Sequence, residues 1–215
     1  MNLRKLLVEF IGTFFLTLTV CLTAYAKVSA DLQPLAIGLI YAAMIYAGGY
    51  LSGAMFNPAV TLAVFLRNKI TAKEAGFYAL VQIAAGIAAA FSTILLTSAK
   101  PQMQPILATP QYFAVIPALA AELLGTFGLV WVVLNVAASK AVEGNNYYGL
   151  AIGLTLSGVM YALGGVSGGA FNPAVAVAAD VAQLGSWANI WLYIAGSLGG
   201  AAAAAAAHRF VNPEG

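Results

Sequence analysis

Ser-Gly-Ala-Met-Phe-Asn-Pro-Ala at residues 52–59 returns almost unchanged as Ser-Gly-Gly-Ala-Phe-Asn-Pro-Ala at residues 167–174. Each copy lies inside a stretch without a charged residue, 32–66 (35 residues) in the first case and 144–179 (36 residues) in the second. Asn followed by Pro is typical of a helix start, because Asn caps the first backbone N–H groups and Pro is tolerated in the first turn. The sequence therefore predicts a helix start in the middle of a membrane-like segment, twice.

The composition indicates a membrane protein. Of the 215 residues, 62% are hydrophobic and 7% are charged, and the mean hydropathy is +0.90. A helix needs ~20 mostly apolar residues to cross a bilayer. We predict six such spans, at about 6–26, 35–51, 76–97, 113–137, 148–164 and 187–208. A net charge of +2 without a basic run argues against nucleic-acid binding, and the single Cys21 excludes an internal disulfide.

The basic residues predict the orientation of these spans. Seven of the nine fall on one side of a six-span topology: Arg4, Lys5, Arg67, Lys69, Lys73, Lys140 and Arg209. Only Lys27 and Lys100 fall on the other side. Because basic residues concentrate on the cytoplasmic side of membrane proteins, we expect a multi-pass protein of the cell membrane with both termini in the cytoplasm.

An internal repeat divides the chain into two halves. Residues 35–62 and 150–177 align without a gap at an offset of 115, with 15 of 28 positions identical. Glu9-Phe-Ile-Gly-Thr likewise matches Glu122-Leu-Leu-Gly-Thr. Each half holds three spans, so the second half must enter the membrane from the opposite face. We therefore predict an all-α membrane protein of six transmembrane helices plus two half-helices in an inverted 3+3 repeat. Residues 1–215 would form one channel domain, with repeats at about 6–97 and 113–208.

The repeated phrase has a physical explanation in this topology. Non-helical backbone at membrane depth is tolerated where it lines a water-filled cavity or is buried in protein. Half-helices at 58–66 and 173–181 would enter from opposite faces and meet with their positive ends together, with Asn57 and Asn172 turning amide donors toward the lumen. Such a path can pass small neutral hydrogen-bonding molecules, while the paired dipole ends repel cations.

These motifs resemble those of the aquaporin and glycerol-facilitator (major intrinsic protein) family, over essentially the whole chain. The resemblance implies a pore in each protomer, a homotetramer in the lipid bilayer, small neutral permeants, and neither cofactor nor metal. The two pore boxes are Asn57, Pro58, Ala59, Asn172, Pro173 and Ala174. Glu9 and Glu122 match the family's buried glutamates, which support the loops leading to these boxes.

Specificity is where the chain departs from the resemblance. The family's narrow filter aligns with Ile37, Met160, Gly169 and Val175, whereas water-specific members place Phe, His, a small residue and Arg there. We expect a wider, apolar filter that passes water and/or small uncharged solutes, with hydrogen peroxide, ammonia, urea, neutral arsenite and glycerol as candidates. Glycerol is less well supported, because Ala176 stands where glycerol-conducting relatives have Asp. The central Asn pair and the opposed helix dipoles are present, so we predict that protons remain largely excluded.

Several other residues and classes stay open at this point. Asp180 is either a solvated carboxylate at the pore mouth or a vestibule site that attracts cations. His208 and Arg209 suggest anchors at the membrane interface, and Gly196 and Gly200 suggest helix packing. The alternatives to a channel are an ion- or proton-coupled transporter of the inverted-repeat type and a non-conducting structural relative. No nucleophile–base set or phosphate loop supports an enzyme.

Overall fold

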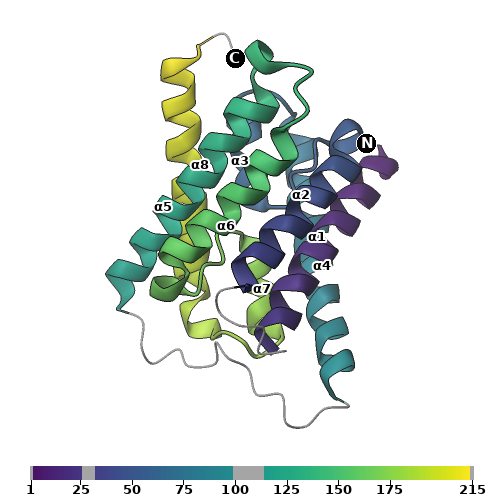
Figure 1. Ribbon diagram of the computed structural model, residues 1–215, viewed down its shortest axis with the longest axis vertical. Coiled ribbons are helices and arrows are strands. Elements are labelled where there is room, and N and C mark those ends of the chain that lie inside the picture. The colour runs from purple at the N-terminus through teal and green to yellow at the C-terminus, as the bar shows by residue number, and fades with distance from the viewer. Residues whose placement is uncertain (1, 26–31, 99–113, 214–215) are drawn as a thin grey trace.

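The computed structural model describes residues 2–25, 32–98 and 114–213, and the regular secondary structure of this part of the chain is all helical (Figure 1). Six long helices are long and apolar enough to cross a membrane. They are α1 (Leu3–Tyr25), α2 (Gln33–Ser52), α4 (Ala72–Ser98), α5 (Val115–Val133), α6 (Tyr148–Ser167) and α8 (Ile190–Val211). The short helices are α3 (Pro58–Leu66), α7 (Pro173–Val181), the π-turn η2 (Leu134–Ala138) that extends α5, and the 3-10 turns η3 (Lys140–Val142) and η4 (Trp187–Asn189).

The six predicted spans and both half-helices are confirmed, with small differences at the ends. The bounds predicted for the half-helices, 58–66 and 173–181, agree with α3 and α7. The fifth span was expected to end at 164 but continues to Ser167, because the left-handed residue that ends it is Gly168 (φ 94°), just as Gly53 (φ 91°) ends α2. The start predicted near Phe113 lies outside the described residues, as do Lys27 and Lys100.

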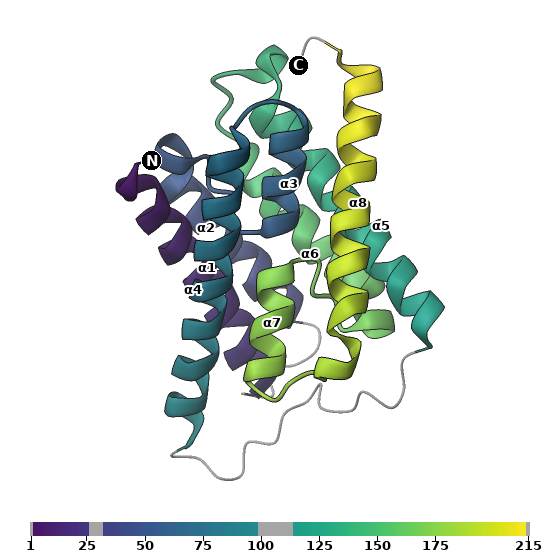
Figure 2. The same ribbon diagram turned by 180° about the vertical axis from the view of Figure 1, so that it is seen from behind.

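The two halves of the chain form an inverted repeat around a shared centre. Within each half the first and last long helices pack together, α1 against α4 and α5 against α8. Across the halves α2 packs against α6, and the half-helices are exchanged, so that α3 lies against α8 and α7 against α4 (Figure 2). Both ends of the described chain lie toward the same end of the bundle, which we call the termini face (Figure 1).

Glycines allow the helices to approach this closely. Gly38 of α2 and Gly153 of α6 occupy equivalent positions of the repeat and touch each other, so a Cβ on either would collide with the carbonyl oxygen of the other. In the last span, a Cβ on Gly196 would lie 2.6 Å from the Cβ of Glu122, and one on Gly200 would collide with the backbone of α5. The predicted packing role of Gly196 and Gly200 is therefore confirmed.

The half-helices bring the two repeated phrases to the middle of the molecule. In Figures 1 and 2, α3 lies in the half of the bundle nearer the termini face and α7 in the opposite half. Their first residues, Pro58 and Pro173, are both buried and line one cavity together. The positive ends of both helix dipoles consequently point at the centre of the bundle.

Candidate pore and filter

Asn57 and Asn172 cap the half-helices and also join the two repeats. The Oδ1 of Asn57 accepts from the N–H of Ala59 at 2.8 Å, and the Oδ1 of Asn172 accepts from Ala174 at 2.9 Å. The Nδ2 of each donates across the repeat boundary to the backbone carbonyl before the other Asn, at 2.9 and 3.0 Å. Each amide nitrogen carries two protons, of which this bond uses one, and both asparagines also line a narrow cavity.

The loops before the Asn residues contain several residues in the left-handed region of backbone conformation. In the first loop Ala54 and Phe56 both have φ 49°, and in the second Gly169 has φ 68° and Phe171 has φ 47°. Left-handed conformations are rare for residues other than Gly, Asn and Asp and persist where the surroundings impose them. The rings of Phe56 and Phe171 provide such surroundings: each fills the space where a side chain on a glycine of the first helix of its repeat would lie.

Glu9 holds the first loop in this conformation. Its Oε1 accepts from the hydroxyl of Ser52 at 2.6 Å and from the N–H of Met55 at 3.1 Å. Its Oε2 accepts from the N–H of Phe56 at 2.8 Å and from the Nε2 of Gln82 at 2.9 Å. The carboxyl is fully buried, and each of its oxygens accepts from two donors.

Glu122 holds the second loop with one donor fewer. Its Oε1 accepts from the hydroxyl of Ser167 at 2.7 Å and from the N–H of Ala170 at 3.0 Å, and its Oε2 accepts from the N–H of Phe171 at 2.7 Å. The position equivalent to Gln82 is Ser197, whose hydroxyl donates within its own helix instead. The buried glutamate therefore accepts hydrogen bonds from the loop in both halves, but Glu122 lacks the side-chain donor that Gln82 gives to Glu9.

Sequence reasoning missed the side chains that close these loops from outside. The hydroxyl of Tyr78 donates to the carbonyl of Ser52, and that of Tyr193 donates to the carbonyl of Ser167. Tyr78 and Tyr193 are 115 residues apart, which is the offset of the repeat. Extending the repeat alignment into the third span of each half is the signal that would have found them.

The four predicted filter residues come together around one narrow cavity. Ile37, Met160, Gly169 and Val175 line it, and so do both box asparagines. The volume that the centre of a water molecule can occupy in this cavity is about 10 Å³. This is about the volume that one water molecule needs. None of the described residues that line this cavity is charged. Tyr41, which the sequence did not single out, also lines it and donates from its hydroxyl to the carbonyl of Met55 at 3.2 Å.

Wider cavities lie on both sides of the narrow one. On the termini face a cavity of about 510 Å³ is lined in part by the segment between α5 and α6, and it shares Tyr41 with the narrow cavity. On the opposite face a cavity of about 60 Å³ shares Val20, Gly169, Ala170 and Val175 with it. The shared walls place the three cavities in a row through the protein, which is the layout of a pore with a constriction.

The structure bears on two predictions for charged or titratable residues. Of the two alternatives left open for Asp180, the solvated carboxylate is wrong, because its side chain lies in the wall of the smaller outer cavity and the residue is only 6% exposed. The prediction for the other residue is also wrong. His208 was expected at the membrane interface, but it is fully buried, with its ring edge-on to Trp131. Both side chains point inward because α7 and α8 turn these positions toward neighbouring helices, which one-dimensional hydropathy does not record.

Comparison with known proteins agrees with this geometry. The family model described as "Major intrinsic protein" matches residues 1–208. The chain is 36% identical to "Aquaporin NIP1-4" of Oryza sativa subsp. japonica, over 98% of this chain and 77% of the relative. It is 33% identical to "Glycerol uptake facilitator protein-like 6" of Lactiplantibacillus plantarum, over 99% of this chain and the full length of the relative.

The fold is likewise that of a solved relative. The X-ray structure of the aquaglyceroporin from Plasmodium falciparum superposes with a TM-score of 0.82, covering 99% of this chain and 98% of that one, at 20% identity. With six apolar helices and a family match over nearly its whole length, the chain is an integral multi-pass membrane protein and belongs to the major intrinsic protein family.

Proposed function

We propose that the protein is a passive channel for small uncharged solutes, with water among them. The observation that carries this proposal is the row of three cavities through the bundle, narrowed at its centre to about the room of one water molecule. The relatives named as an aquaporin and as a glycerol uptake facilitator support the same class of permeant.

The constriction selects against charge in this proposal. Its filter residues are Ile37, Met160, Gly169 and Val175, none of which can replace the hydration shell of an ion. The positive ends of α3 and α7 meet beside it and repel cations. Water keeps some hydrogen bonds through the free amide protons of Asn57 and the equivalent Asn172, whereas a larger polyol would lose more. The candidate permeants besides water are therefore hydrogen peroxide, ammonia, urea and neutral arsenite, and glycerol is the least supported because Ala176 stands where glycerol-conducting relatives have Asp.

The same proposal includes the domain organisation, the two glutamates, the orientation in the membrane and the assembly. Residues 1–215 act as one channel domain, with repeats at about 6–97 and 113–208, and Glu9 and Glu122 act as structural supports without proton chemistry. The termini face is the cytoplasmic side of the cell membrane, because the basic residues concentrate toward it. The assembly is a homotetramer with one pore in each protomer, as the family resemblance implies.

Stopped-flow light scattering on proteoliposomes tests the proposal, with sucrose, glycerol, urea and hydrogen peroxide as solutes. A channel gives water flux with a low activation energy and no saturation. Saturating flux would instead favour a coupled transporter, and no flux above that of empty liposomes would favour a non-conducting relative. Both outcomes contradict the proposal.

The filter assignment has its own test, in the variant Val175→Arg. Because Val175 lines the constriction, a guanidinium there adds a positive charge and several donors, and it should narrow the range of solutes while water still passes. Val175→Leu is the matched control, since it adds bulk without charge or donors. If both variants conduct the same solutes as the original protein, Val175 is not part of the filter.

A further inference from the structure

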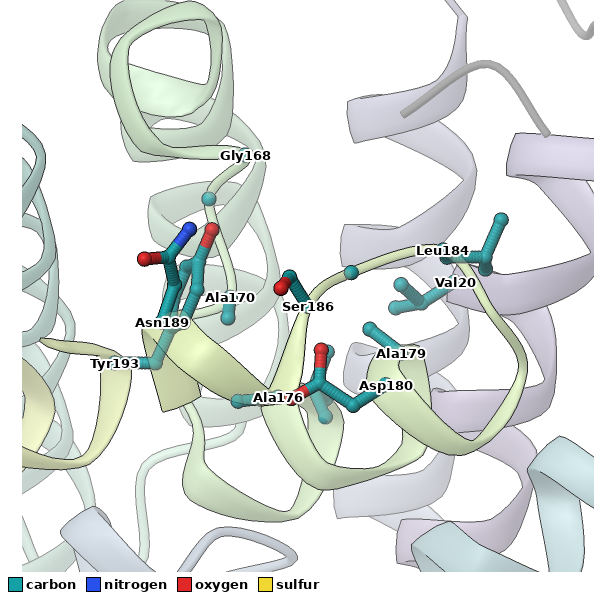
Figure 3. Close-up of a pocket in the computed structure, with 13 residues that line it drawn as sticks. Val20, Gly168, Ala170, Ala176, Ala179, Asp180, Leu184, Ser186, Asn189 and Tyr193 are labelled. Carbon is teal, nitrogen blue, oxygen red and sulfur yellow. The ribbon is translucent and has the colours of Figure 1, made fainter. Parts of the chain in front are cut away.

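The outer cavity on the α7 side contains a polar side chain that the proposed conduction does not use. This cavity, which we call the α7-mouth pocket, is drawn in Figure 3. It has about 60 Å³ of room for water centres and shares the filter residues Gly169 and Val175 with the constriction. Anything bound in the α7-mouth pocket therefore lies directly at the entrance to the narrow part of the pore.

The carboxylate of Asp180 lines this pocket and has no hydrogen-bond partner in the part of the chain that the structure describes. Asp180 is 6% exposed, and its Oδ2 is buried with no hydrogen-bond donor among the described residues. Figure 3 shows the carboxylate rising from α7 toward the segment that carries Ser186. Its Oδ1 lies so close to Gly185 that a Cβ there would collide with it. Buried carboxylates are normally paired or hydrogen-bonded. Because the described residues supply no donor to the carboxylate of Asp180, we expect a donor from a bound molecule or ion.

The equivalent helix end in the other half shows what is missing. Helix α3 ends at Leu66, where Arg67 is the C-cap and Arg209 donates from Nη2 to the carbonyl of Leu66. Cations at that position complement the negative end of the helix dipole. The position in α7 that corresponds to Arg67 is Ala182.

The end of α7 has the opposite charge arrangement. It carries the negative end of a dipole together with the Asp180 carboxylate in its last turn, and Asp180 forms no ion pair with a described residue. The two negative contributions add, so the potential at the α7-mouth pocket favours a cation.

We propose that the α7-mouth pocket binds a monovalent cation that carries N–H donors, such as ammonium or a primary alkylammonium. The Asp180 carboxylate, which lines the pocket, accepts one charge-assisted hydrogen bond through its more accessible oxygen, and the oxygens of Ser186 and Asn189, which line the same pocket, accept others. A divalent metal fits poorly, because it takes six or more oxygen ligands or several His, Cys and carboxylate side chains. Among the described residues no group of three or more such side chains occurs.

The bound cation stays at the mouth. Beyond the pocket lie the uncharged filter and the positive ends of the half-helices, which oppose its passage. An occupied pocket consequently narrows the entrance, and the flux of neutral solutes falls as the concentration of the cation rises on that side. This consequence rests on the proposed channel function, whereas the binding itself does not.

Isothermal titration calorimetry on the full chain in lipid nanodiscs measures binding without conduction, with methylammonium chloride as the probe. We expect saturable binding to the original protein and an affinity about tenfold lower or more for Asp180→Asn, because a hydrogen bond to a charged group is lost. Glu143→Gln is the matched control: it removes one carboxylate from the cavity on the termini face and should bind as the original protein does. Ser186→Ala, a second variant at a half-buried turn, should weaken binding about fivefold.

Three results would overturn the proposal: no saturable binding to the original protein, equal affinity in Asp180→Asn, or potassium chloride binding as tightly as methylammonium. The last would remove the requirement for N–H donors. Stopped-flow water flux with methylammonium outside the vesicles is the companion measurement, with potassium chloride at equal osmolarity as the reference. Absence of any flux contradicts the channel proposal alone, while flux that ignores methylammonium in spite of measured binding contradicts the placement of the cation at the pore entrance.

Discussion

The packing of α4 against the second pore box yields a test that separates a steric clash from helix propensity. Gly86 of α4 is buried, and a Cβ there would lie 2.6 Å from the carbonyl oxygen of Ala174 and 3.6 Å from the Cβ of Ala178. Gly76 lies on the same helix with nothing within 4 Å of its ideal Cβ. The variants Gly86→Ala and Gly76→Ala therefore make the same chemical change on one helix, once in contact with the pore box and once in open space.

The expected magnitudes follow from this geometry. An ordinary carbon–oxygen contact needs about 0.8 Å more than Gly86 allows, and overpacking of this kind costs about 1–3 kcal/mol. Both variants gain up to about 1 kcal/mol of helix propensity. The propensity contribution is similar in both and largely cancels in the comparison, so Gly86→Ala should be less stable than Gly76→Ala by about 1–3 kcal/mol. For a chain of this size that difference corresponds to a Tm lower by about 2–12 °C.

The first assay is thermal unfolding of the detergent-solubilised protein, monitored by size-exclusion chromatography. The second assay is the water flux of the same variants in proteoliposomes. Because the clash pushes on Ala174, beside a constriction that holds about one water, the flux of Gly86→Ala should also fall. Gly76→Ala should keep both the stability and the flux of the original protein or exceed its stability. Equal Tm values and equal flux in the two variants would refute the reasoning.

Three further predictions concern single side chains. Glu122→Gln replaces one accepting oxygen by a donor that faces a backbone N–H or a hydroxyl, and it should cost about 2–3 kcal/mol; an unchanged Tm would contradict the supporting role. Cys21 is fully buried, so a maleimide should label the folded protein far more slowly than the protein unfolded in dodecyl sulfate, and rapid labelling of the folded form would be inconsistent with the packing of α1. Burial raises the pKa of Asp180, which lies outside the six spanning helices, to about 6. Methylammonium binding should accordingly weaken as the pH falls through about 6, because protonation removes the charge, while the nearby phenols Tyr25 and Tyr193 stay neutral; pH-independent binding would contradict this.

The repeated phrase made the architecture predictable from the sequence. Asn57-Pro58 and Asn172-Pro173 start helices by local chemistry alone, and the uncharged stretches around them fix the setting as a membrane. Because three spans separate equivalent positions, the inversion of the second half follows from counting. These properties depend on neighbours in the sequence, on a period or on a repeat offset, and each agrees with the fold.

The contacts between distant segments were not predictable in the same way. Asn57 and Asn172 donate hydrogen bonds across the repeat boundary, and Gln82 gives Glu9 its fourth donor. The sequence separation of these partners does not predict the bonds. It does not predict the burial of Asp180 either. These features depend on how closely the helices approach one another. Glycines such as Gly86 permit a close approach, but a glycine in the sequence does not show which helix will lie against it.

The sequence by itself therefore determined the class of protein, the six spans, the two half-helices and the residues that meet at their tips, because helix starts, membrane length and repeat symmetry are local or periodic properties. Only the tertiary structure decided how wide the constriction is, which donors hold each loop, and that one of the outer cavities contains a carboxylate with no partner in the described part of the chain. Those features arise where side chains from separate helices fill one space, and they depend on how these side chains pack together.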